Sequence, residues 1–269
     1  SGSNGAAEFL PADALFASYV SMREPNQLFQ EFTAVVTKQD PSFEADLAEV
    51  NQKLGPGFFE DLTMALGTEA AFALNGLSMN GPVWTMAALV YNPTVVDNSI
   101  RRLVEAVNAE LSLEEQDKRL VLTQETVNGR VWNTMKSRGL PFGITWTYDR
   151  GYLVAGSDRA SAERAIATRN GGSPLVWSHD FLAQLPSSAA IHPSAFAWLN
   201  TKGAFELLAT FSPSQTVKDL LASRDPALIV FDGTENQIHA ASRARLSGMI
   251  MDAMLLQSLT GAGQSRTVQ

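Results

Sequence analysis

The chain has 269 residues, of which 45% are hydrophobic and 18% charged, and its formal net charge is −8. This composition is typical of a folded globular protein and excludes wholesale disorder. Because no Lys/Arg run is longer than Arg101-Arg102, we expect neither a nucleic-acid partner nor an electrostatic hold on anionic lipid. The chain has no cysteine, which removes disulfides, thiol catalysis and cysteine-bound metal centres and leaves the compartment open.

The first third of the chain alternates strands with helices. We predict a strand over 14–20, then two helices that begin at Pro25 and near Asp40-Pro41, because proline suits the first turn of a helix. Apolar residues at helical spacing predict a buried face on each helix. These residues are Leu28, Phe29, Phe32, Val35 and Val36 on the first helix, and Phe43, Leu47, Val50 and Leu54 on the second.

Further strands and helices follow along the chain. We predict a short helical turn over 58–66 and strands over 68–74 and 83–91, the last apolar on both faces and therefore central. A long amphipathic helix comes next, with an apolar face of Val96, Ile100, Leu103, Val107 and Leu111.

The stretch 119–156 predicts an antiparallel meander. Asn128-Gly129 is its best hairpin signal, since both residues tolerate the positive φ of a type I′ turn. Phe142, Ile144, Trp146 and Tyr148 alternate with Gly143, Thr145, Thr147 and Asp149, which predicts a half-buried strand. Ser157 is expected to cap a helix that ends near Thr168.

The last third echoes the first. Leu185-Pro186 repeats Leu10-Pro11, and residues 228–231 before Asp232-Gly233 repeat 72–74 before Asn75-Gly76. We therefore expect an α+β fold, with antiparallel sheets packed against amphipathic helices, in two diverged repeat units. The expected division is a disordered leader over 1–8, a first unit with the added meander over 9–175, a smaller second unit over 176–262 and a disordered tail over 263–269. Chance similarity between the two halves is the alternative.

The small polar residues of the leader have two interpretations. The segment fits a domain released from an upstream signal peptide, lipid-anchor segment or membrane helix, or the remnant of a tag on a cytoplasmic protein. The longest apolar tract, 249–256, contains Asp252 and is far shorter than the roughly 20 residues that cross a bilayer.

Few residues are candidates for chemistry, and each has a structural interpretation that we favour. The three histidines are His179, His192 and His239, and we expect Ser178 or Asp180 to cap a short helix beside an exposed His179. Gly156-Ser157-Asp158 sits at a strand-to-helix turn but lacks the small residues of a nucleophile elbow. We expect the pair Glu60-Asp61 to lie on a solvated helix face. The five tryptophans are expected in the core or on sheet faces: Trp84, Trp132, Trp146, Trp177 and Trp198.

Four segments together carry a family resemblance. They are Leu10-Pro11-Ala12-Asp13-Ala14, residues 67–74, residues 151–157, and Ser178-His179-Asp180-Phe181 before Leu185-Pro186. In this order they resemble a family of bacterial exported or membrane-anchored domains classified only as of unknown function. The resemblance covers most of residues 9–260. It implies a location in the periplasm or cell envelope and a membrane anchor upstream, and it supplies no catalytic residues.

The sequence therefore assigns no catalytic, cofactor-binding or metal-binding residue, and we expect no cofactor. The leading hypothesis is a non-enzymatic extracytoplasmic domain of a bacterial envelope protein with a binding or structural role, whose partner is a protein or a small apolar ligand. One alternative is a carrier of an apolar small molecule in a cleft between sheet and helices. Another is a hydrolase whose residues converge only in three dimensions.

Overall fold

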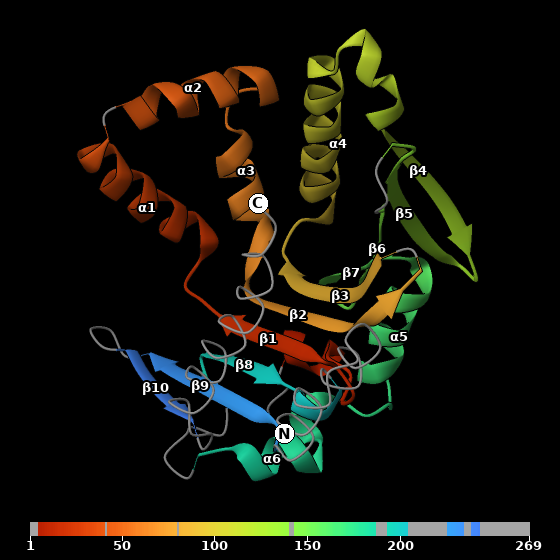
Figure 1. Ribbon diagram of the computed structural model, residues 1–269. Helices are drawn as coiled ribbons and strands as arrows, with labels where there is room; N and C mark the ends of the chain where they lie inside the picture. Colours follow the sequence, from red (N-terminus) through yellow and green to blue (C-terminus); the bar gives the residue numbers. More distant parts are fainter. Residues whose placement is uncertain are drawn as a thin grey trace, which may run out of the picture.

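The computed structural model describes residues 5–40, 42–79, 81–139, 143–186, 193–203, 225–233 and 238–242. One antiparallel sheet forms the centre, in the order β10-β9-β8-β1-β2-β3-β7-β6-β5-β4 (Figure 1). The α+β prediction is confirmed. The strands are β1 (Phe16–Ser21), β2 (Leu66–Ser78), β3 (Gly81–Val90), β4 (Leu120–Val127), β5 (Arg130–Ser137), β6 (Gly143–Asp149), β7 (Tyr152–Gly156), β8 (Ala195–Leu199), β9 (Ala227–Gly233) and β10 (Ile238–Ser242). The α-helices are α1 (Pro25–Gln39), α2 (Ser42–Leu54), α3 (Phe58–Ala65), α4 (Pro93–Glu110), α5 (Arg159–Arg169) and α6 (His179–Gln184), and the 3₁₀ helices are η1 (Gly5–Phe9), η2 (Leu113–Lys118) and η3 (Leu175–Trp177).

Both faces of the sheet are covered, so alternate residues of a strand enter different cores. On β7, Tyr152 and Val154 pack with η1, α5, η3 and α6, whereas Leu153 and Ala155 pack with the first turns of α4 and the end of α3. Apolar residues on both sides of a strand are what a central position requires. β3, which the sequence predicts to be central, lies between β2 and β7 as expected.

The meander is confirmed, with β4, β5, β6 and β7 paired in chain order. Asn128 and Gly129 join β4 to β5 with φ angles of +52° and +77°, as the hairpin signal predicts. The half-buried interpretation of β6 is wrong, because Thr145, Thr147 and Asp149 are all buried. The Thr147 hydroxyl donates to the Val131 carbonyl oxygen at 2.6 Å, so this buried polar side chain has a hydrogen-bond partner within the protein.

Part of the predicted leader is instead a buried element. Ala6, Ala7 and Phe9 of η1 are almost fully buried between the sheet and α5. The Ala6 N–H donates to the Glu69 carboxylate at 3.0 Å, and Gly5 lies against the same carboxylate with φ +55°, where a side chain would clash. The contacts that order this segment come from residues more than sixty positions away.

The two predicted repeat units contribute to a single sheet. β1 pairs antiparallel with β8, with Phe16 opposite Leu199. The strands outward from this pair run β1-β2-β3 on one side and β8-β9-β10 on the other. The repeat and the division at 175/176 stay predictions, and the predicted helix over 246–259 lies outside the described residues. Among the described helices, none is long and apolar enough to span a membrane.

The burial of η1 generates a stability prediction. Phe9 is 1% exposed and packs on Tyr152 with ring centroids 5.3 Å apart, so Phe9→Ala should lower the free energy of unfolding by about 3–5 kcal/mol. Urea denaturation measures this loss. Met79→Ala is the control, because Met79 is fully exposed and its truncation should cost less than about 0.5 kcal/mol. A Phe9→Ala loss as small as the control's would show that the segment does not dock in solution.

Candidate functional site

Three helices leave the sheet between β1 and β2. We call α1, α2 and α3, residues 25–65, the helical arm; α1 and α2 stand away from the sheet, and α3 returns the chain to β2 (Figure 1). The predicted buried face on α1 is wrong: α1 has no buried residue, and Phe32 and Val35 are 58% and 54% exposed. On α2 only Leu54 is buried. The apolar residues of α1 are at helical spacing, but no described element of the chain fully covers them.

Aromatic contacts hold the arm helices to one another. Phe29 of α1 stacks on Phe59 of α3 with ring centroids 5.5 Å apart, and within α3 Phe58 meets Phe59 edge-on at 5.3 Å. Phe32 touches the edge of Phe43 at 6.1 Å, which ties α1 to α2 and leaves more than half of Phe32 open to solvent. These pairs stabilise the arm although little surface is buried. Each contributes about 0.5–1.5 kcal/mol to stability beyond the burial of its rings.

Arg102 connects the arm to α4. Its Nε donates to the Leu54 carbonyl oxygen at the end of α2, and its guanidinium lies 5.2 Å from the centre of the Phe58 ring. One terminal nitrogen lies 4.0 Å from the Asp61 carboxylate. A single planar cation thus contacts the end of α2 and the start of α3, a combination that the guanidinium group favours.

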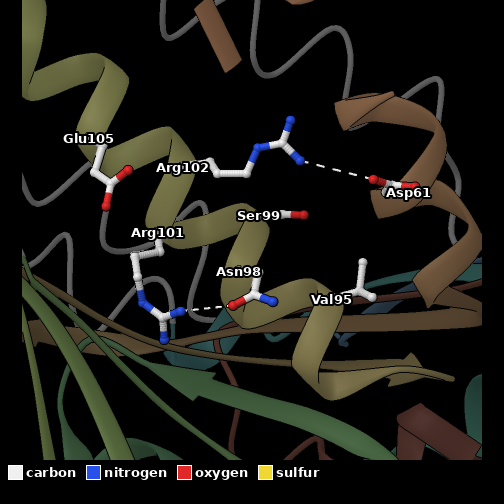
Figure 2. A pocket seen from close by; sticks show the side chains of 7 residues that line it. All are labelled: Asp61, Val95, Asn98, Ser99, Arg101, Arg102 and Glu105. Carbon is white, nitrogen blue, oxygen red and sulfur yellow. Dashed lines mark hydrogen bonds and ion pairs between the residues drawn. The ribbon is translucent and has the colours of Figure 1, made fainter. Parts of the chain in front are cut away.

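A hollow of about 360 Å³ lies between α3 and α4. Figure 2 shows Arg102 facing Asp61 across it, while Arg101 turns to Asn98, to which it donates at 2.8 Å. Its lining consists of Asp61, Val95, Asn98, Ser99, Arg101, Arg102 and Glu105. Because four of these seven side chains are charged, the hollow suits polar groups and does not fit the apolar molecule of the carrier hypothesis.

A second polar cluster lies where α4 crosses the meander. One oxygen of Asp97 accepts hydrogen bonds from the Trp146 indole at 3.1 Å and the Tyr148 hydroxyl at 2.7 Å. Burial, together with the hydrogen bond to Asp97 and its negative charge, raises the pKa of Tyr148 above its usual range. Asp97 and Trp146 also line a hollow of about 180 Å³ with Arg101, Leu122, Thr123, Gln124 and Asn133. The cluster fixes α4 on the sheet.

Of the three histidines, the structure describes the side-chain surroundings of His179. His179 is exposed at the start of α6, and the Ser178 hydroxyl accepts the Phe181 N–H at 3.2 Å, so the capping interpretation is confirmed. His239 lies on β10 opposite Asp232 in the ladder. His192 lies outside the described residues. Among those residues, no group of three or more His, Asp or Glu side chains is placed to hold a metal ion.

The other candidate residues have mostly structural roles. The cap of α5 is Asp158, whose carboxylate accepts the Ser161 N–H at 2.7 Å; the prediction that Ser157 caps it is wrong, because the helix begins one residue later. Glu60 and Asp61 are exposed in the first turn of α3, where the helix dipole favours negative charge.

The tryptophans divide between core and surface. Trp132, Trp146 and Trp198 are buried as expected, and Trp84 stacks on Phe72 with ring centroids 6.2 Å apart. Trp177 differs from the prediction, because its side chain is 51% exposed at the end of η3.

Comparisons with known proteins add little. No protein-family model matches the chain, and no curated protein matches it. One solved structure, described as "Structure of crystal form III of TP0453", matches with 9% sequence identity and a TM-score of 0.38, covering 89% of this chain and 78% of that chain. At these values the similarity supports no conclusion about fold or function.

The Arg102 contacts predict that the arm loosens when they are removed. Arg102→Gln should speed hydrogen exchange of the α2 and α3 amides by about tenfold or more, since a charged hydrogen bond and a cation–π contact are lost together. Exchange in β3 and β7 should not change. Arg101→Gln is the matched control, because among the described residues Arg101 donates a hydrogen bond to Asn98 on its own helix and to no residue of the arm. Equal exchange in the two variants would contradict the role given to Arg102.

The Tyr148 environment predicts a stability change at alkaline pH. The pKa of tyrosine in an unfolded chain is about 10. The pKa of Tyr148 in the folded protein is higher, so it ionises at a higher pH. The unfolded state therefore loses the proton first, and the free energy of unfolding falls as pH rises above about 10. Tyr148→Phe should make this fall shallower, by less than the roughly 1.4 kcal/mol per pH unit that one proton contributes. Urea denaturation at several alkaline pH values measures the slope, and an unchanged slope would contradict the prediction.

Proposed function

We propose that this chain is a non-enzymatic binding domain of a bacterial envelope protein and that the helical arm is its interaction surface. The observation that carries the proposal is the exposure of Phe32 and Val35 on a helix with no buried residue. The two residues are three positions apart, so they lie on the same side of α1. An apolar helix face that the described part of the fold leaves open has the character of a docking surface.

The energetics favour a partner on this surface. An isolated helix the length of α1 is marginally stable in water, and helices in proteins depend on packing of their apolar face. Fully burying a Phe or Val side chain contributes about 1.5–3 kcal/mol. Binding that covers Phe32 and Val35 would therefore both order α1 and supply affinity.

The envelope location depends on the sequence resemblance described above. Cell fractionation tests it directly, because an antibody to this chain should detect the protein in the periplasmic or membrane fraction of the producing bacterium. Detection in the cytoplasm alone would refute the location and leave the binding surface untouched.

Photo-cross-linking in the producing cells tests the binding function. A benzoylphenylalanine placed at position 32 or 35 should give a discrete cross-linked product that mass spectrometry assigns to the same partner from both positions. The control positions are Val131 and Leu182, which are 45% and 47% exposed on β5 and α6. Absence of a product from the arm, or the same products from the control positions, would contradict an interaction surface on α1.

A further inference from the structure

The charge on the helical arm is strongly one-sided. Residues 25–65 contain seven Asp and Glu side chains and two Lys side chains. The exposed apolar residues lie among them, with Glu31 directly before Phe32 and Glu49 directly before Val50. The arm therefore carries most of the net charge of −8 on a surface that also presents apolar side chains.

Much of this negative charge is not neutralised within the described part of the chain. Glu44, Asp46 and Glu60 take part in no ion pair there. Lys53 lies 3.2 Å from both Glu49 and Glu110, so one of the two lysines is shared between two carboxylates. A field of one sign around an apolar face selects partners of the opposite sign.

The negative charge of the arm distinguishes between the molecules that could bind its apolar side chains. The arm as a whole carries more carboxylates than lysines and would repel an anionic lipid surface, since membrane-binding helices carry Lys and Arg beside their apolar face. A second copy of the chain would place two acidic arms against each other, and like charges across an interface are unfavourable. A cationic amphipathic polypeptide satisfies both the apolar side chains and the carboxylates.

We propose that the helical arm binds a cationic amphipathic segment of a partner protein, with Phe32 and Val35 contacting its apolar face and the arm carboxylates contacting its Lys and Arg side chains. This partner class rests on the proposed function. Exposed ion pairs each contribute about 0–1 kcal/mol, so the apolar contacts supply most of the affinity. The charges set partner choice and speed association, and they make binding weaker at high salt.

The test uses a defined probe and the full chain. The probe is a fluorescent Leu/Lys peptide of about 18 residues, roughly five helical turns, with its leucines on one face. Fluorescence anisotropy should show saturable binding, with a dissociation constant that rises severalfold as salt increases. A peptide of the same composition with its leucines scattered around the helix, and a Leu/Glu peptide of the same pattern, should each bind at least tenfold more weakly. Equal binding of either control peptide would overturn the proposal.

Matched variants locate the site. Phe32→Gln with Val35→Gln should raise the dissociation constant at least tenfold, and Glu44→Gln with Asp46→Asn should raise it severalfold and flatten its salt dependence. Leu182→Gln, an exposed apolar residue on α6, should leave both unchanged. Circular dichroism confirms that each variant is folded. No effect of the arm variants, or an equal effect of Leu182→Gln, would overturn the assignment.

Two measurements identify the competing occupants. Cosedimentation with phosphatidylcholine–phosphatidylglycerol vesicles that is lost in the Phe32→Gln, Val35→Gln variant would assign the surface to a membrane. A dimer in light scattering that this variant dissociates would assign it to a second copy. Either result overturns the cationic partner. If the peptide fails to bind while the arm positions still cross-link one protein in cells, the partner class is wrong and the binding function stands.

Discussion

The antiparallel pairing of β1 with β2 determines where the helical arm begins and ends. Ser21 lies opposite Glu69, and the Met22 N–H donates to the Thr68 carbonyl oxygen at 2.8 Å, so the chain leaves and re-enters the sheet at one place. One face of the sheet is covered by η1, α5, η3 and α6, and the other receives the start of α4 and the end of α3. The arm is thus inserted between two adjacent strands whose faces are already occupied. Its first two helices consequently have mainly each other, α3 and Arg102 to pack against.

The sequence predicted the elements well and the arm's surroundings poorly. The meander, the Asn128-Gly129 turn and the central position of β3 follow from local signals, which is why they could be predicted. A helical period, in contrast, shows that α1 has an apolar face and not what covers that face. The exposure of Phe32 and Val35, and with it the candidate site, depends on contacts that no local pattern encodes. The acidic composition of the arm as a whole, residues 25–65, was an available signal, because a segment that packs into a core seldom carries so many carboxylates.

The N-terminal segment and β6 failed for a related reason. Small residues around Gly5 resemble a flexible leader, yet Glu69 and Tyr152 hold the segment through a hydrogen bond to the Ala6 amide and a ring contact with Phe9. On β6, threonines between aromatic residues resemble a solvated face, yet Thr145 meets the Thr134 hydroxyl at 3.2 Å on the neighbouring strand. In both places a distant partner satisfies a polar group, and such partners cannot be read from the residues nearby.

An open apolar face also exposes a protein to self-association, and the arm's charges oppose this. Each copy carries a net charge of −8, concentrated in the segment that presents Phe32 and Val35, so two arms repel before their apolar side chains meet. Repulsion of this kind is screened by salt over about 8–10 Å near physiological ionic strength, and it therefore acts mainly at close approach. The same carboxylates that keep the copies apart would attract a cationic segment of a partner protein. Under the proposed function, charge and apolar exposure on the arm act together: the charge opposes self-association and favours partners that neutralise it.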